Sequence, residues 1–90
     1  MANVTTYSIK KIETAATIYD TPVLLGKIIW SAMTSGHTLV IDDADGNEPL
    51  YRATAGANND YFEFDFNGMS RSLKVTTIDG GKLLIYPYII

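Results

Sequence analysis

The most apolar stretch of the chain, residues 23–33 (VLLGKIIWSAM), predicts the central strand of a β domain. A helix is disfavoured because Pro22 precedes the stretch, Gly26 interrupts it, and two β-branched isoleucines lie in its middle, where a strand packs them better. Alternate side chains of a strand face opposite sides, and both sides of this stretch are largely apolar. We therefore expect a strand with a core on at least one side and with Trp30 in that core. Leu25 is expected to face away from Trp30.

Apolar and polar residues alternate most cleanly in residues 61–66 (YFEFDF), which predict an antiparallel strand with one wet face. Its three phenylalanines would face the core, and its tyrosine and two acids would face solvent. Two short segments have the composition of turns, residues 20–22 (DTP) and 67–68 (NG). We expect each of them to separate two strands.

Glycines recur at about every ten to twelve residues between short β-rich runs, a spacing typical of sandwiches and barrels. The strongest hairpin loop is residues 43–47 (DADGN), because Asp-Gly tolerates positive φ. The fold class expected is therefore all-β: a compact antiparallel β-sandwich or barrel of about seven or eight strands. A chain of 90 residues forms one domain, 1–90, and we expect residues 1–6 to be a flexible amino-terminal arm.

The composition narrows the choice of partners. The formal net charge is −3, and the seven lysines and arginines are dispersed, so neither nucleic acid nor a membrane surface is an expected partner. The chain has no cysteine, which excludes disulfides and zinc–thiolate sites. Its amino terminus lacks the charged and apolar regions of a signal peptide, and no apolar run approaches about 18 residues. We expect a protein that is made in the cytoplasm and used without signal-dependent export.

One acidic cluster is a candidate calcium site, since hard cations need several converging oxygens. Its members are Asp42, Asp43, Asp45 and Glu48. The spacing fails the template of a calcium loop, because glycine at the sixth position would require an acid at Ile41. A solvated hairpin tip is the preferred interpretation, and cation binding stays open.

The sequence offers no set of catalytic residues. His37 is the only histidine, and no Ser/His/Asp spacing or second histidine accompanies it, so we interpret it as a turn residue. Glu63 and Asp65 are neighbours on one strand face, but a glycosidase pair also needs a cleft and one raised pKa. The wet face of a sheet explains them better. We predict no enzymatic activity, no cofactor and no metal.

Surplus aromatic and terminal apolar residues predict an interaction surface instead. Six tyrosines exceed what a small core requires, and tyrosine suits sites that are apolar on one side and wet on the other. Because of Pro87, we expect the last strand either to end at this residue or to lie at an edge of the sheet. Two isoleucines follow near the end of the sequence. The interface candidates are Tyr7, Tyr51, Tyr61, Tyr86, Tyr88, Ile89 and Ile90.

The succession TAATIYDTPVLLGKIIWSAMTSGHTLVIDDADGNEPLY, DYFEFDF and SLKVTTIDGGKLLIYPY resembles small virion proteins of tailed bacteriophages, particularly head decoration (cement) proteins. The resemblance spans residues 14–88 and carries over no catalytic motif. It implies a β-sandwich or barrel on the capsid surface of the virion, bound to the major capsid protein. It also implies a homo-oligomer, often a trimer at a three-fold position, that braces the shell against internal DNA pressure.

Two functions from other classes compete with this expectation. The first is a carbohydrate- or receptor-binding domain of a phage tail or fibre. The second is a small enzyme or regulator that uses His37 with the carboxylates of residues 42–48, and it would require a deep pocket that joins them.

Overall fold

A computed structural model of the chain describes residues 9–46 and 48–88, and it is all-β, as expected. These residues form one antiparallel sheet of six strands in the order β1-β6-β2-β5-β3-β4 and no helix. The strands are β1 (Lys10–Ile12), β2 (Ala16–Ser31), β3 (Thr38–Asp42), β4 (Pro49–Thr54), β5 (Tyr61–Ile78) and β6 (Lys82–Pro87). The sheet is not closed, because its end strands, β1 and β4, each pair with one neighbour only.

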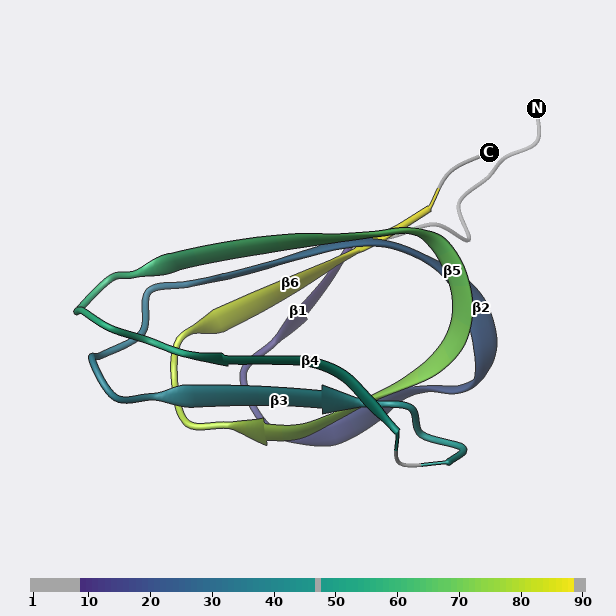
Figure 1. Ribbon diagram of the computed structural model, residues 1–90, viewed down its shortest axis with the longest axis horizontal. Helices are drawn as coiled ribbons and strands as arrows, with labels where there is room; N and C mark the ends of the chain where they lie inside the picture. Colours follow the sequence, from purple (N-terminus) through teal and green to yellow (C-terminus); the bar gives the residue numbers. More distant parts are fainter. Residues whose placement is uncertain (1–8, 47, 89–90) are drawn as a thin grey trace.

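The two longest strands give the sheet its shape. β2 and β5 pair with each other along most of their length, and Figure 1 shows both curving sharply at the same end of the molecule. β6 pairs with residues 25–31 of β2, whereas β3 pairs with residues 74–78 of β5. β6 and β3 therefore extend the sheet from opposite halves of the bent pair β2/β5. The two halves enclose a common core.

Both expected turns, residues 20–22 and 67–68, lie inside strands, so the prediction that they separate strands is wrong. Residues 20–22 of β2 are opposite Ser72 alone, because the pairing shifts there. Likewise residues 66–68 of β5 are opposite Gly26 alone. Extra residues in one strand of a pair bend it without ending it. Four expected strands consequently merge into two, which is why the described chain has six strands rather than seven or eight.

The bend at Gly26 also changes which residues share the core. Leu25, Ile28 and Trp30 all belong to one buried cluster, although simple alternation predicts that Leu25 faces away from the other two. The shift in pairing between residues 25 and 27 reverses the alternation at this point. Trp30 is fully buried, which confirms its expected place. Its ring stacks on Phe62 at 5.5 Å, and its Nε1–H donates to the carbonyl of Gly80 at 2.9 Å.

Several expected features lie outside the described residues: the arm (1–6), Tyr7, Ile89 and Ile90. Within the described ranges, the structure has no helix of the length and apolarity needed to cross a membrane.

Candidate interaction surface

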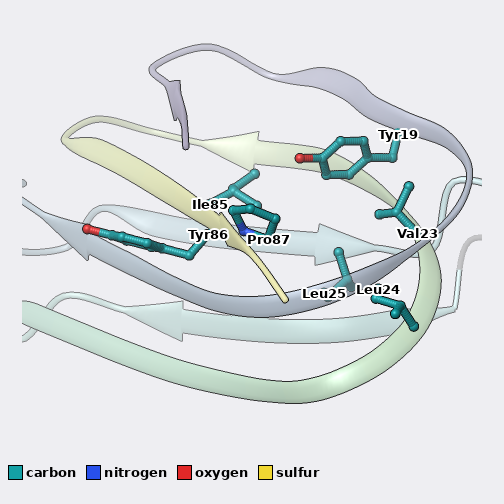
Figure 2. A pocket seen from close by; sticks show the side chains of 7 residues that line it. All are labelled: Tyr19, Val23, Leu24, Leu25, Ile85, Tyr86 and Pro87. Atoms are coloured by element: carbon teal, nitrogen blue, oxygen red, sulfur yellow. The ribbon is translucent and has the colours of Figure 1, made fainter. Parts of the chain in front are cut away.

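An apolar hollow lies where the bend of β2 meets the end of β6 (Figure 2). Its volume is about 100 Å³, and its lining is Tyr19, Val23, Leu24, Leu25, Ile85, Tyr86 and Pro87. In Figure 2 the rings of Tyr19 and Pro87 and the aliphatic side chains lie around this hollow, whereas the ring of Tyr86 extends away from it. The bend of β2 therefore brings residues from both of its halves against one end of β6.

Gly26 allows the end of β6 to lie this close to the bend. A Cβ atom at this position would be 2.6 Å from the backbone carbonyl oxygens of both Tyr86 and Pro87. The amide of Tyr88 then donates to the carbonyl of Leu24 at 3.2 Å, which continues the contact past the end of β6. A glycine within an apolar strand thus marks a close approach of two backbones.

A second, more open hollow of about 280 Å³ adjoins the first and shares Tyr86 and Pro87 with it. Lys27 and Asp65 also line it, together with Tyr88 and Gly26. The Nζ of Lys27 lies 5.1 Å from the centre of the Tyr86 ring, a cation–π contact. This hollow combines aromatic faces with one positive and one negative charge.

The surface around both hollows exposes large apolar side chains. Leu24 is 38% exposed, Met69 is 42% exposed and Tyr88 is 38% exposed. Met69 pairs with Leu25, next to Leu24, and Gly68 brings the ring of Tyr88 against the same bend of β5. We call this surface the C-terminal patch, and it consists of Tyr19, Val23, Leu24, Met69, Tyr86, Pro87 and Tyr88.

The first hollow is suited to burying an apolar group rather than to catalysis. One of its two tyrosines, Tyr19, has a pKa raised by burial, and the ammonium of Lys10 lies 5.8 Å from the ring of Tyr19. Among residues 9–46 and 48–88, no carboxylate lines this hollow. Sites for small molecules generally occupy about 300 Å³ or more, so the hollow has room for about one side chain of a partner.

The acidic loop forms a different kind of site, in which the carboxylates are paired. Asp43 accepts hydrogen bonds from the hydroxyl of Ser72, from the amide of Asp45 at 2.8 Å and from Arg71 at 2.9 Å. These contacts, the one from Ser72 first, lower the pKa of Asp43 to about 2. Asp43 is only 8% exposed, so its charge depends on these partners.

A second carboxylate and a second arginine extend this arrangement. The hydroxyl of Thr76 and the guanidinium of Arg52, at 3.0 Å, both donate to Asp42 and lower its pKa. Arg71 also donates to Glu48 at 3.0 Å, and its two carboxylate partners raise its pKa. We call this group the ion-paired cluster, and it consists of Asp42, Asp43, Glu48, Arg52, Arg71, Ser72 and Thr76.

The ion-paired cluster explains the acidic loop without a cation. Arginines and hydroxyl groups occupy the carboxylate oxygens that a calcium ion would need. Among the described residues, no group of three or more His, Cys, Asp or Glu side chains is arranged to hold a metal ion. The loop holds β3 and β4 together through Asp43, whose amide donates to the carbonyl of Glu48 at 2.7 Å.

Three of the predicted tyrosines lie in one region, because Tyr86 and Tyr88 line the second hollow and Tyr61 is close enough to Tyr86 to interact with it electrostatically. Tyr86 and Tyr88 lie in the C-terminal patch. Tyr61, the first residue of β5, is 56% exposed, and its hydroxyl donates to Glu63 at 3.0 Å, which raises the pKa of Tyr61. Tyr51 is half-buried, and its ring lies 5.0 Å from that of Phe64.

The patch residues Leu24, Met69 and Val23 were not among the predicted interface residues. Leu24 and Val23 belong to the most apolar stretch of the sequence, which indicated a core strand. The signal that could have identified them is the combination of Pro22 and Gly26 within one strand, since proline and glycine often mark a bulge.

The other polar candidates are His37, which lies beside a turn, and Glu63 and Asp65, which lie on an exposed side of β5. His37 follows the turn at residues 35–36; its Nδ1 accepts from the amide of Thr34 at 3.2 Å, and its ring packs against Gly80. It precedes β3, whereas the acidic loop follows β3, roughly 15 Å away along the strand. Glu63 and Asp65 are exposed, and Glu63 pairs with Lys27 at 3.4 Å.

Comparison of the chain with known protein families, with curated proteins and with solved structures finds no significant match.

Proposed function

We propose that this chain is a structural protein of a tailed-phage virion that binds the outside of the capsid and stabilises the head. The observation that supports this proposal best is the C-terminal patch, where Leu24, Met69 and Tyr88 are each exposed by about two-fifths. Large exposed apolar patches are typical of interaction surfaces. The phage origin comes from the resemblance of the sequence to head decoration proteins.

The proposed partner is the major capsid protein, and the proposed state is a homo-oligomer, with a trimer favoured at three-fold positions. The bent sheet would serve as a compact sandwich-like frame for the patch. Neither nucleic acid nor a membrane is a proposed partner, and no enzymatic activity is proposed. The protein would be made in the host cytoplasm and would act on the capsid surface.

The free energy of binding that the patch can supply is modest for one copy, which suits a protein that binds a shell in many copies. Burying the exposed part of each large apolar side chain is worth roughly 1 kcal/mol at about 25 cal/mol per Å². A partner that binds only the assembled shell stabilises it by mass action, and many copies on one shell multiply the effect.

The test uses heads assembled without this protein, to which the purified chain is added. We expect binding in sedimentation and a higher temperature of DNA release. A Tyr88→Ser variant should bind at least about tenfold more weakly, since a loss of roughly 1.4 kcal/mol corresponds to that factor.

Ile9→Ser is the matched control, because Ile9 is an apolar residue that is 54% exposed and lines neither hollow. It should bind as the unmodified chain does. Failure of the unmodified chain to bind intact heads would contradict the proposal, as would an equal loss of binding in the two variants.

The second hollow favours one other function, the binding of a carbohydrate by a domain of a phage tail or fibre. Tyr86 and Tyr88 could stack on sugar rings while Lys27 and Asp65 bind hydroxyl groups. Titration of bacterial surface glycans, followed by calorimetry, tests this function. Trp30 is fully buried and therefore does not serve as a fluorescent reporter. Glycan binding that Lys27→Ala abolishes would favour this function over capsid binding.

A further inference from the structure

The first half of β5, residues 61–66, has one edge without a strand partner in the described chain. β2 pairs with this half along one edge, from Ser31 opposite Tyr61 to Lys27 opposite Asp65. On the other edge β5 pairs with β3, but only over residues 74–78. This edge of residues 61–66 is therefore an open edge of the sheet.

This edge differs from the other open edges of the sheet. β1 has three residues, two of them lysines; β4 begins with Pro49; and the first half of β2 contains the bulge at residues 20–22. Short length, charge, proline and bulges are the features that protect edges from pairing. Residues 61–66 have no proline or glycine, their charged residues are Glu63 and Asp65, and residues 61–65 keep an unbroken register with β2.

An apolar side chain beside this edge is left incompletely covered. Phe64 is 39% exposed, although it lies between the rings of Tyr51 at 5.0 Å and Phe66 at 5.1 Å. Phe62, on the same side of the strand, stacks on the buried Trp30. A further strand beside residues 61–66 would cover Phe64 with its own side chains, because strands pair with like faces together.

The opposite side of the strand carries negative charge. Glu63 and Asp65 are both exposed, and Asp60 lies just before the strand. The oxygens of Asp60 accept hydrogen bonds from the amides of Gly56 and Tyr61, which lower its pKa. The ammonium of Lys27 lies 3.4 Å from Glu63, so the two carboxylates on this side of the strand outnumber the one ammonium beside them.

A second copy of the chain does not fit this edge. Two copies related by a two-fold axis would pair residues 61–66 antiparallel with like faces together. The two registers that include most of the segment place Glu63 opposite either Glu63 or Asp65 of the other copy. Like charges directly opposite one another destabilise a strand pair.

From these observations we propose that residues 61–66 of β5 bind an extended segment of another protein as an additional antiparallel strand. The segment has apolar residues on the side of Phe64 and alternating lysine or arginine on the side of Glu63 and Asp65. Backbone hydrogen bonds to β5 supply the affinity, and the alternating basic residues supply the specificity. This surface adjoins the C-terminal patch, because Asp65 also lines the second hollow, but the proposal does not depend on capsid binding.

The experiment uses the full chain and a short synthetic peptide in which valine and lysine alternate. Calorimetry measures binding, and amide chemical shifts locate it. We expect shifts centred on residues 61–66 and an affinity that falls as salt is added. A peptide with glutamate in place of lysine should bind at least about tenfold more weakly. A peptide methylated on alternate amide nitrogens should not bind, because it cannot donate to the edge.

The protein variants test the charges directly. Glu63→Lys with Asp65→Lys should reverse the preference between the two peptides, and its thermal unfolding checks that the fold is kept. Glu13→Lys with Asp20→Lys changes the net charge equally at exposed sites elsewhere, and it should leave the preference unchanged. Equal binding of the methylated peptide, equal effects of the two double variants, or shifts centred on another edge would each overturn the proposal. The proposal would also be overturned if the valine–lysine peptide did not bind and the double variant Glu63→Ala/Asp65→Ala associated with itself. The two acids would then serve only to prevent copies of the chain from pairing.

Discussion

The C-terminal patch and the ion-paired cluster meet at the bent pair of strands, where Val23 pairs with Arg71, but their side chains have opposite environments. In the cluster, Asp42 and Asp43 are nearly buried, and arginines and hydroxyl groups occupy their oxygens. In the patch, large apolar side chains such as Leu24 and Met69 stay in contact with water. The carboxylates of the cluster already have hydrogen-bond partners within the chain, whereas the apolar side chains of the patch could still be buried by another protein.

The difference separates structural chemistry from binding chemistry. Acidic side chains close together in a sequence suggest a metal or catalytic site, yet here they fasten a hairpin loop to β5 through Arg71 and Ser72. Apolar residues in a strand suggest a core, yet here the bend turns some of them outward. The contacts of a side chain, rather than its type, decide which residues remain available to a partner.

The largest effect expected within this comparison comes from two adjacent leucines. Leu25 is 1% exposed and Leu24 is 38% exposed. Leu25→Ala should lower the free energy of unfolding by about 3 kcal/mol, because it leaves a cavity in the core. Leu24→Ala should cost only about 1 kcal/mol, since more than a third of Leu24 is already exposed to water and its truncation leaves no enclosed cavity.

Urea denaturation measures both leucine variants. Similar losses of stability would mean that Leu24 is part of the core and that the patch is not a free surface. If Leu24→Ala lost head binding but kept its stability, Leu24 would contribute to binding and not to folding.

A somewhat smaller loss is expected where the end of β6 lies against the bend of β2. Gly26→Ala places a Cβ atom 2.6 Å from two backbone carbonyl oxygens, and backbone cannot move aside as a side chain can. We expect a loss of about 2–3 kcal/mol in the free energy of unfolding. The control is Gly56→Ala, where the nearest atom to a Cβ would be 3.8 Å away, and it should change stability by less than about 0.5 kcal/mol. An unchanged stability in Gly26→Ala would contradict the close approach of β6 and hence the geometry of the patch.

The ion-paired cluster should show itself as a dependence of stability on pH. The pKa of Asp43 is lowered from 3.8 to about 2 in the folded protein, so folding favours its ionised form. This contribution is fully present above about pH 4 and is lost as the pH falls through about 2. In Asp43→Asn the stability should be lower at neutral pH and should fall less steeply between pH 4 and 2.

Urea midpoints measured across this pH range test the prediction for Asp43. Asp20→Asn, at an exposed carboxylate in the bulge of β2, should keep the steep dependence of the unmodified chain. If the two variants lose the steepness equally, Asp43 is not the group that links stability to pH.

The sequence predicted the strands well and their connections less well. The alternation in residues 61–66 and the Asp-Gly loop after β3 identified real elements, because both signals are local. The segments DTP and NG are equally typical of turns, and only the opposite strand decides that they become bulges: Ser72 faces one and Gly26 faces the other. The patch depends on those bulges, so its residues could not be separated from the core by periodicity alone. Tyr86 and Tyr88 were predicted to be interface residues because tyrosine near a proline-terminated strand indicates a surface, and the structure shows only that Tyr88 is 38% exposed.

The smallest expected effect concerns an ion pair that belongs to neither site. Lys27 and Glu63 are 3.4 Å apart, and their side chains are 40% and 44% exposed. Water and salt screen such a pair, so Glu63→Gln should change the free energy of unfolding by less than about 0.5 kcal/mol. Urea denaturation at low and at high salt measures this change, and Lys27→Gln is the partner variant. A loss above about 1 kcal/mol at low salt would mean that this pair resembles the ion-paired cluster. A negligible loss leaves Glu63 available to the basic strand proposed for the edge of β5, because a charge that contributes little to folding can change partners at little cost.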